Sequence, residues 1–321
     1  MSILIYADSS NGHLTKNAFE AANYASQLAQ KTGDKAVAVV TGNVSGLDQL
    51  GKFGISKVLH VANAELNNFD PQKIAHAIAE AAKAENSSVI VFAHDYSGKS
   101  VAPFLAAKLD AGLVTGAIAL PNTDGGFTVK KSVFSGKAFA EVEVLTPIKI
   151  ISVLPNAIPK IENNVTVEVV DYTVTLPSTN LKVKEIKKES SELSLTEADI
   201  VVSAGRGLKG PENWGMIEEL AHVLGAATAC SRPVADIGWR PHHEHVGQTG
   251  LAIRPNLYFA IGISGAIQHL AGVNGSKVIV AINTDAEAPF FKAADYGIVG
   301  DAFDVVPKLI EAFKKFKAAN N

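Results

Sequence analysis

Apolar runs alternate with amphipathic helical patterns in two separate series along this chain of 321 residues. Alternation of this kind predicts a parallel sheet, because each helix carries the chain back to the starting edge of the sheet. Helices then cover both faces, so the strands are apolar throughout. The first series has apolar runs at Ile3–Ala7, Ala36–Thr41, Val58–Val61, Val89–Ala93 and Leu113–Ile118, and helical patterns at Leu14–Gln30, Pro71–Lys83 (with Asp70 as its N-cap) and Lys99–Leu109.

From Gly126 to about Val174 the spacing changes to alternating apolar and polar positions, which is typical of half-buried strands. We expect these segments to add antiparallel strands to the first sheet. The N-terminal part of the chain is therefore predicted to be an α/β domain with a β-rich end. The added strands are expected at Phe127–Phe134, Ala138–Val144, Lys149–Val153 and Val165–Val170.

A polar and charged stretch, residues 182–197, separates the two series and has no core-forming period. This is typical of a solvated linker, so we expect one domain over residues 1–190 and a second over residues 191–321. The second series predicts another doubly wound parallel sheet. Its strands are expected at Asp199–Ala204, Ala226–Cys230, Leu257–Ile261, Lys277–Asn283 and Gly297–Gly300, and its helices at Pro211–Leu224, Ser264–Ala271 and Val305–Phe316.

Composition excludes several classes of protein. Cys230 is the only cysteine, so no internal disulfide can form and a reducing compartment is expected. The formal net charge of −3 provides no basic surface for nucleic acid. Residues 1–7 lead directly into a strand pattern without a signal or transit segment, and no apolar run has membrane-spanning length. We therefore expect a cytoplasmic protein without membrane insertion.

The strongest candidate for a ligand site follows the apolar run Leu257–Ile261, where Gly262-Ile263-Ser264-Gly265 leads into a helical pattern. A strand, a glycine turn and a helix start together direct backbone N–H groups at one point, and glycine lets an anion approach closely. We expect a phosphate or pyrophosphate here, with Ser264 as a hydrogen-bond donor. A nucleophile elbow would need glycine at position 266, which is alanine. For His269, both a core role and a functional role are open.

A second glycine pattern, Gly205-Arg206-Gly207-Leu208-Lys209-Gly210, matches the dinucleotide fingerprint G-x-G-x-x-G and lies between an expected strand and an expected helix. An NAD site would have an acidic residue at the end of the next strand. This chain has Ser231-Arg232 there, which suits an anion such as the 2′-phosphate of NADP. The alternative is a glycine-rich turn with a solvated or salt-bridged Arg206.

Two further patterns favour a structural interpretation. Ala93–Ser100 ends in Gly-Lys-Ser after a strand, but alanine stands where a phosphate-binding loop requires its first glycine, so a plain turn with a surface lysine is expected. Pro241–His245 contains three histidines and Glu244, yet neighbouring residues on a loop do not converge on a metal without further ligands. We expect a solvated or partner-facing loop and no metal site.

The second domain contains, in order, the motifs Gly205-Arg206-Gly207, Ser231-Arg232-Pro233, Val246–Gly250, Gly262–Gly272, Ala281-Ile282-Asn283 and Ala294–Val299. Together they resemble the motifs of the electron transfer flavoprotein alpha-subunit family (ETF alpha, or FixB). The resemblance covers essentially all of residues 195–321, whereas the first domain agrees mainly in size and pattern. The family resemblance implies an N-terminal domain of the nucleotide-alpha-hydrolase-like (HUP-like) type and a C-terminal FAD-binding domain of the DHS-like, Rossmann type.

The resemblance also implies cofactors and site residues. Members pair with a beta subunit, hold one FAD mainly in the C-terminal domain, and carry AMP in the beta subunit. By resemblance, Arg232 lies against the isoalloxazine, Thr249 near flavin N5 and His269 near the pyrimidine carbonyl, and each favours reduced flavin. The full set of implied contacts is Arg206, Ser231, Arg232, Val246, Gly247, Gln248, Thr249, Ser264, Gly265, Ala266, Ile267, Gln268, His269, Asn283 and Asp301.

The function implied by the resemblance is electron transport. Such a protein accepts electrons from flavin dehydrogenases, typically the acyl-CoA dehydrogenases of fatty acid beta-oxidation, and passes them to a membrane-bound ETF-ubiquinone oxidoreductase. It has no organic substrate and no catalytic residue of its own, because the redox centre is the flavin. Two alternatives are an NADP-dependent oxidoreductase, favoured by Gly205–Gly210 with Ser231-Arg232, and a non-redox nucleotide-binding partner module.

Overall fold

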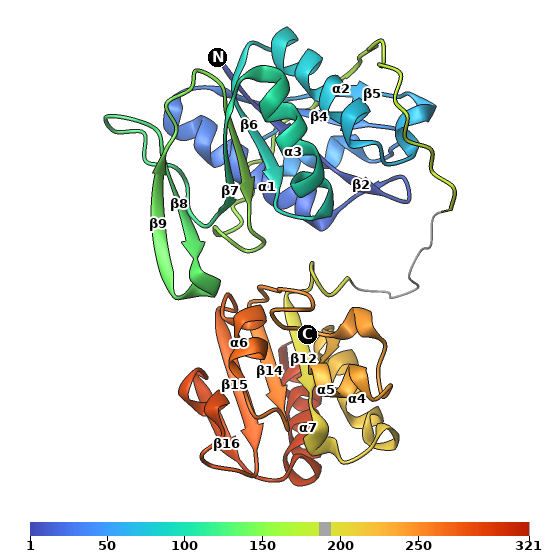
Figure 1. Ribbon diagram of the computed structural model, residues 1–321, viewed down its shortest axis with the longest axis vertical. Helices are drawn as coiled ribbons and strands as arrows, with labels where there is room; N and C mark the ends of the chain where they lie inside the picture. Colours follow the sequence, from blue (N-terminus) through green and yellow to red (C-terminus); the bar gives the residue numbers. More distant parts are fainter. Residues whose placement is uncertain (186–193, 321) are drawn as a thin grey trace. The chain divides into compact units, whose positions relative to one another are not determined.

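The computed structural model describes residues 1–185 and 194–320. The chain divides into two compact units, Met1–Lys188 and Glu189–Asn321, each with its own sheet and its own core (Figure 1). The domain boundary expected between residues 190 and 191 falls outside the described residues, as does part of the charged stretch. Among the described residues, no helix is long and apolar enough to cross a membrane.

The N-terminal unit is built on a nine-stranded sheet with the order β11-β5-β4-β1-β6-β10-β7-β8-β9. Every apolar run of the first predicted series forms a parallel strand in this sheet. The strands are β1 (Ser2–Tyr6), β4 (Lys35–Thr41), β5 (Lys57–Val61), β6 (Ser87–Ala93), β7 (Gly112–Ala117), β8 (Thr128–Val133), β9 (Ala138–Glu143), β10 (Lys149–Val153) and β11 (Glu168–Asp171), with a small hairpin of β2 (Ser9–Ser10) and β3 (His13–Leu14).

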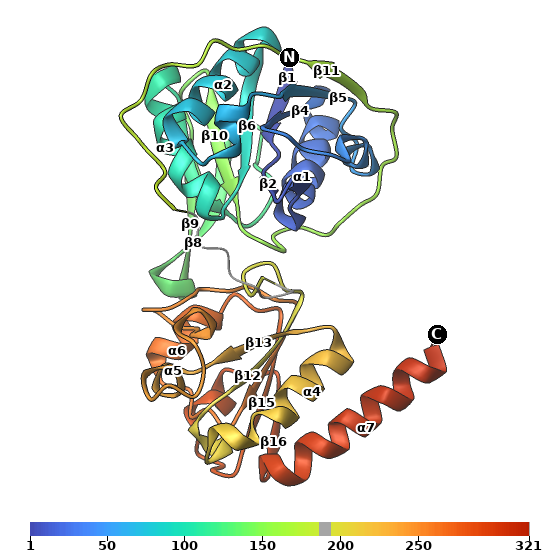
Figure 2. The same ribbon diagram turned by 90° about the vertical axis from the view of Figure 1, so that its right-hand side faces the viewer.

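Three long helices cover this sheet on its two faces (Figure 2). Alternate residues of β1 point to opposite faces, so Ile3 and Ile5 pack under one helix while Leu4 and Tyr6 pack under the other two. Asp70 accepts hydrogen bonds from the first backbone N–H groups of the second helix, which confirms the predicted cap. The helices are α1 (Lys16–Thr32), α2 (Pro71–Ala84) and α3 (Tyr96–Leu109), and the 3-10 turns are η1 (Leu47–Lys52), η2 (Ala64–Asn67) and η3 (Phe134–Gly136).

The predicted direction of two strands was wrong. β8 and β9 form an antiparallel hairpin as expected, but β10 runs parallel between β6 and β7, and β11 runs parallel to β5 at the sheet edge. Residues 150–153 of β10 are buried on both faces, as in a central parallel strand. Strand direction depends on a partner far away in the sequence, and the local alternation of apolar and polar residues does not encode it.

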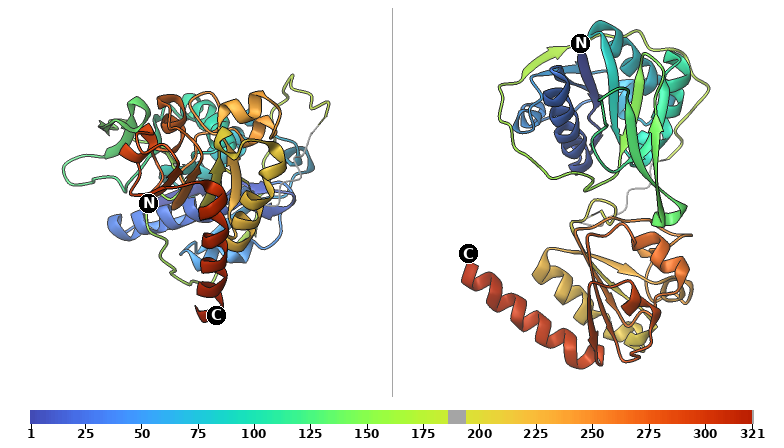
Figure 3. Two further views of the ribbon diagram at one scale, coloured as in Figure 1. Left: turned by 90° about the horizontal axis from the view of Figure 1, so that it is seen from below. Right: turned by 90° about the vertical axis from the view of Figure 1, so that its left-hand side faces the viewer.

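The C-terminal unit has a five-stranded, fully parallel sheet, which confirms the predicted second doubly wound fold. α4 and α7 pack on one face and α6 on the other, while α7 continues well past the sheet (Figure 3). The elements are β12 (Ile200–Ala204), η4 (Arg206–Leu208), η5 (Pro211–Asn213), α4 (Gly215–Leu224), β13 (Ala227–Cys230), α5 (Arg232–Asp236), η6 (His242–Glu244), β14 (Leu257–Ile261), α6 (Ile267–Val273), β15 (Val278–Asn283), η7 (Pro289–Lys292), β16 (Tyr296–Val299) and α7 (Ala302–Asn320).

Candidate functional site

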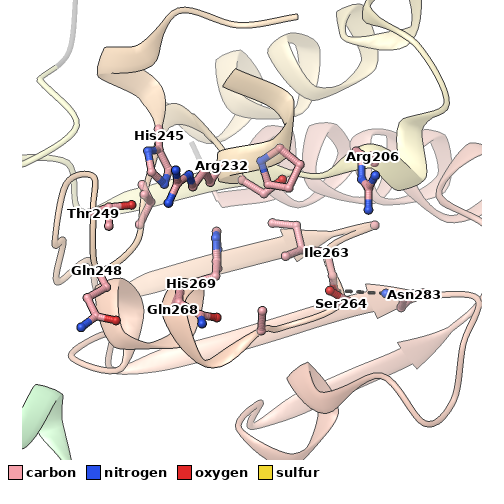
Figure 4. A pocket seen from close by; sticks show the side chains of 15 residues that line it. Arg206, Arg232, His245, Gln248, Thr249, Ile263, Ser264, Gln268, His269 and Asn283 are labelled. Atoms are coloured by element: carbon pink, nitrogen blue, oxygen red, sulfur yellow. Dashed lines mark hydrogen bonds between the residues drawn. The ribbon is translucent and has the colours of Figure 1, made fainter. Parts of the chain in front are cut away.

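The strand order of the C-terminal sheet, β13-β12-β14-β15-β16, locates the site. From β12 the chain moves first to one side, to β13, and then to the other side, to β14. Ligands of open α/β sheets bind at such a switch point, beyond the carboxyl ends of the strands. A cavity of about 410 Å³ lies there, and it is lined by the segments that follow β12, β13 and β14 and by the end of β15 (Figure 4).

The cavity brings together most of the residues predicted from the sequence. Four predicted residues are not in its lining, namely Gly247, Gly265, Ile267 and Asp301, and four unpredicted ones are, namely Pro233, His245, Gly262 and Ile263. Pro233, His245 and Ile263 each adjoin a predicted contact, and Gly262 and Ile263 belong to the glycine turn that the sequence marks as the strongest candidate site, so a signal for these residues was available. The predicted residues in the lining are Arg206, Ser231, Arg232, Val246, Gln248, Thr249, Ser264, Ala266, Gln268, His269 and Asn283.

The first two glycines of the G-x-G-x-x-G pattern, Gly205 and Gly207, have a packing role. A Cβ on Gly205 would stand 2.4 Å from the carbonyl oxygen of Gly262, and one on Gly207 would stand 2.6 Å from the Cα of Gly262. The N–H of Gly207 donates to this carbonyl at 3.1 Å. The turn also continues through η4 and η5 before α4 begins, so the pattern does not open a helix directly. Contact between two glycine turns therefore explains these residues without a dinucleotide.

Two further glycines hold the opposite wall of the cavity. A Cβ on Gly272 in α6 would stand 2.5 Å from the Cα of Gly247, and one on Gly265 would stand 2.5 Å from the backbone nitrogen of Phe290. Gly265 also has φ of +87°, a conformation that favours glycine. Because Gly265 is not helical, α6 begins at Ile267 and not at Ser264, as the sequence had predicted. Gly247 and Gly265 thus shape the site from outside its lining.

The charge of the cavity is positive. Arg206 and Arg232 both line it, and no aspartate or glutamate does. Arg232 is the first residue of α5, a helix too short to predict, and its Nε lies 3.3 Å from the Asp236 carboxylate. Its side chain is 61% exposed, so the guanidinium remains available to a ligand. The arrangement suits an anionic or electron-rich ligand.

His269 is the least exposed titratable group of the cavity wall. Its Nε2 lies 2.7 Å from the hydroxyl of Tyr258, and its Nδ1 has no hydrogen-bond partner among the described residues. Burial, with a smaller contribution from His245, lowers the pKa of His269 to about 4. The imidazole is therefore neutral at pH 7 and presents one unused nitrogen to the cavity.

The low pKa of His269 predicts an acid-sensitive C-terminal unit. In the unfolded chain this histidine takes up a proton below about pH 6.5, whereas in the folded chain it stays neutral down to about pH 4. The contribution of His269 to the free energy of unfolding is therefore fully present above pH 6.5 and is lost as the pH falls toward 4. Between pH 7 and pH 5 the expected loss is about 2 kcal/mol. Urea unfolding followed by tryptophan fluorescence measures it, because both tryptophans, Trp214 and Trp239, lie in this unit. The variant His269→Gln should lack this loss, and equal pH dependence in the two proteins would contradict the assignment.

The loop Pro241–His245 differs in part from its prediction. Its first three residues are exposed as expected, but Glu244 and His245 are buried, and His245 lines the cavity. The burial of Glu244 is explained by Arg240, which donates hydrogen bonds to both of its carboxylate oxygens, at 2.9 and 2.6 Å. A carboxylate paired in this way can be buried. Among the described residues, no group of three or more histidine, cysteine, aspartate or glutamate side chains could hold a metal ion.

Asn283 and Asp301, the last two residues of the implied set of FAD contacts, have structural partners. The Nδ2 of Asn283 donates to the carbonyl of Ile263 at 3.1 Å, which ties the end of β15 to the glycine turn. Asp301 lies outside the lining, where it accepts from the N–H of Phe303 at the start of α7 and lies 3.4 Å from Lys209. Asn283 therefore borders the cavity, and Asp301 stabilises the neighbouring turn and helix.

Comparisons with known proteins agree with this architecture. Residues 3–177 match the family model described as electron transfer flavoprotein domain, and residues 194–274 match the electron transfer flavoprotein FAD-binding domain. The electron transfer flavoprotein subunit alpha of Bacillus subtilis is 37% identical over 318 residues, which cover 98% of this chain and 97% of the relative. That of Thermoanaerobacterium thermosaccharolyticum is 40% identical over 98% of both chains, and that of Pseudomonas aeruginosa is 38% identical over 97% of this chain and 100% of its own. The chain therefore belongs to the family of electron transfer flavoprotein alpha subunits.

Proposed function

We propose that this chain is the alpha subunit of a heterodimeric electron transfer flavoprotein and that its C-terminal cavity holds FAD. The observation that carries the proposal is the cavity itself, which lies at the switch point of the sheet and combines two arginines, no carboxylate and an unpartnered buried Nδ1 of His269. A dinucleotide with an anionic pyrophosphate and a ring rich in acceptor atoms fits this set of donors.

The side chains divide between the two ends of the cavity. Arg206 and Asn283 lie at one end of the drawn site, and Thr249 and Gln248 lie at the other (Figure 4). We assign the first end, with Ser264, to the pyrophosphate and ribose, because a guanidinium and a hydroxyl suit phosphate oxygens. We assign the second end, with Arg232 and His269, to the isoalloxazine ring. In this arrangement Asp301 contributes only by holding Lys209 and the neighbouring turn.

Bound flavin supplies the redox chemistry, since it accepts and releases electrons. The chain supplies the electrostatic surroundings. Arg232 provides a fixed positive charge, which favours added negative charge in the cavity. The hydroxyl of Thr249 can donate or accept a hydrogen bond, and neutral His269 can do either through Nδ1 without carrying a charge. The protein therefore sets the potential of the cofactor and transforms no organic substrate of its own.

Removal of the Arg232 charge is expected to make the flavin harder to reduce. In Arg232→Ala, binding of reduced relative to oxidised flavin should weaken by up to about tenfold, which lowers the one-electron potential by up to about 60 mV. The exposure of Arg232 and its contact with Asp236 keep the effect at or below this limit. Lys209→Ala is the matched control, since it removes an equal charge outside the cavity lining. Spectroscopic redox titration measures the flavin potential of both variants. An unchanged potential in Arg232→Ala would contradict the electrostatic role of Arg232.

The proposed assembly contains a beta subunit, one FAD per heterodimer and AMP in the beta subunit. The N-terminal unit of this chain supports the placement of AMP elsewhere. Its own cavity, of about 660 Å³, is lined by Asp8, by hydroxyl and amide side chains and by several apolar ones, and no lysine or arginine of the described residues lines it. Such a lining offers a phosphate no positively charged side chain, and the Asp8 carboxylate would repel it. Mass spectrometry of nucleotides released from the assembled complex and from each separated subunit tests this distribution.

We further propose that the complex carries electrons from flavin dehydrogenases, such as acyl-CoA dehydrogenases, to a membrane ETF-ubiquinone oxidoreductase. The deciding experiment is a visible absorption spectrum of the chain co-expressed with its beta subunit, recorded before and during anaerobic reduction by an acyl-CoA dehydrogenase and its substrate. A yellow complex that is bleached by this donor supports the proposal. A colourless protein, or one that turns over NADPH with a small substrate, would overturn it.

A further inference from the structure

Tyr258 lies behind the cavity wall and forms a buried pair with His269, which is part of that wall. Tyr258 is the second residue of β14 and His269 is the third residue of α6. Tyr258 is 0% exposed and His269 is 7% exposed, and the hydroxyl oxygen of the first is 2.7 Å from Nε2 of the second. Phe290 packs edge-on against the imidazole, with 5.7 Å between ring centroids, and stacks on the Tyr258 ring at 6.2 Å. These contacts hold the imidazole in one orientation, with Nε2 toward Tyr258.

The direction of the hydrogen bond follows from the protons available. Burial lowers the pKa of His269 and raises the pKa of Tyr258, so both groups are neutral at pH 7. Either the phenol donates to a bare Nε2, or Nε2–H donates to the phenol oxygen. In the second case the phenolic O–H can turn only to Ser203, which faces it, and the buried Ser203 O–H is then left without an acceptor in the described part of the chain; in the first case Ser203 can donate to the phenol oxygen. An unpaired buried O–H is costly, so the phenol donates.

Nδ1 of His269 then carries the single imidazole proton. This nitrogen is buried, has no partner among the residues that the structure describes, and belongs to a side chain that points into the cavity (Figure 4). We propose that Tyr258 is a positioning residue for His269, because its donation to Nε2 holds the tautomer that presents Nδ1–H to the cavity. The ligand atom selected in this way is a hydrogen-bond acceptor of the carbonyl type.

The inference rests on the proposed function only where it names that acceptor as a carbonyl oxygen of the flavin. A neutral N–H donor strengthens its hydrogen bond as negative charge accumulates on the acceptor. Tyr258 therefore favours the reduced form of the cofactor without touching it. Without the phenol, the imidazole can place its proton on either nitrogen, and in one of the two tautomers a lone pair of Nδ1 faces the acceptor.

The tautomer is measured by NMR on the assembled heterodimer with histidine labelled with ¹⁵N, since protonated and bare ring nitrogens resonate in different regions. His269→Gln identifies the resonances of His269. We expect the proton on Nδ1 in the native complex and a mixture of tautomers, or Nε2–H, in Tyr258→Phe, which retains the ring and loses only the hydroxyl. Tyr24→Phe is the matched control, because Tyr24 is also 0% exposed and donates at 2.8 Å to the carbonyl of Ala119 in the other unit.

The flavin potential is a second measurement. Tyr258→Phe should weaken binding of reduced relative to oxidised flavin by threefold to tenfold, which lowers the one-electron potential by about 30–60 mV. Tyr24→Phe should leave the potential unchanged. In a His269→Gln background, Tyr258→Phe should produce no further shift, because a glutamine amide has no tautomer to select. A tyrosine with a merely structural role would shift the potential equally in both backgrounds.

The two measurements separate failure of this inference from failure of the proposed function. A native His269 that carries its proton on Nε2, or a tautomer that is unchanged in Tyr258→Phe, overturns the role of Tyr258. An equal shift of the potential with histidine or glutamine at position 269 overturns it as well. A complex without flavin overturns the proposed function instead, and the NMR measurement on that complex still decides what Tyr258 does.

Discussion

Arg240→Ala is expected to destabilise the C-terminal unit by about 3 kcal/mol. The Glu244 carboxylate, whose side chain is 11% exposed, accepts hydrogen bonds from Nε and Nη2 of Arg240 at 2.9 and 2.6 Å. Loss of the guanidinium leaves this carboxylate buried without a counter-charge, and the stacking of Arg240 on Trp214 at 5.5 Å is lost with it. His245, the next residue and part of the cavity wall, should then lose its position, and flavin content should fall.

Urea unfolding monitored by circular dichroism and tryptophan fluorescence measures this effect. The control is Lys314→Ala, which breaks the pair between Lys314 and Glu219 at 2.7 Å, where both side chains are more than half exposed. Such a pair contributes about 0–1 kcal/mol. In Arg240→Ala the added change Glu244→Gln should restore part of the loss, because it removes the uncompensated charge. A loss no larger than that of the control would show that the buried pair does not hold the loop.

Gly272→Ala is expected to cost about 3 kcal/mol, although alanine normally stabilises a helix relative to glycine. The new methyl group would stand 2.5 Å from both the Cα and the nitrogen of Gly247. Both neighbours are backbone atoms, so α6 and the loop at Val246–Thr249 must separate. That loop and α6 supply Gln248, Thr249, Gln268 and His269 to the cavity. The same change should therefore reduce flavin content.

Gly215→Ala is the matched control for this substitution. Gly215 is the first residue of α4, and a Cβ there meets nothing within 4 Å. We expect a gain of up to about 1 kcal/mol and unchanged flavin content. The comparison requires the unfolding midpoint and the ratio of flavin to protein absorbance for both variants. If Gly272→Ala were as stable as Gly215→Ala, the close contact between α6 and Gly247 would not exist in the protein.

Most secondary structure of the chain could be predicted from local pattern. The run Leu257–Ile261 is β14 with the predicted bounds, and Asp70 caps α2 as its sequence position indicates. Both depend on neighbours within a few residues, which the sequence displays directly. α5 was missed because five residues, one of them Pro233, show no helical period. The start of α6 was predicted too early because Gly265 has a left-handed φ and therefore belongs to the turn before the helix. The apolar pattern does not show this.

Part of the candidate site was also predictable, because the strand pattern shows which residues follow each strand. Residues that follow parallel strands meet at one edge of a sheet, so Arg206, Ser231 and Ser264 could be expected to lie together. His245 was left out, because its burial depends on Arg240 and Glu244 and on a place beside Arg232 that no local pattern reveals. The pairing of Tyr258 with His269 has the same origin, because β14 and α6 bring the two side chains together in three dimensions and no local pattern links them.

The sequence by itself determined the two α/β units, the strands and helices within them, and the glycine turns that follow the strands, because apolar period, capping residues and glycine act over a few residues. The tertiary structure decided the direction of β10 and β11, the packing of Gly207 on Gly262 and of Gly272 on Gly247, and the proton-bearing side of His269. Each of these depends on which distant segments come into contact, and that follows from burial of the whole sheet.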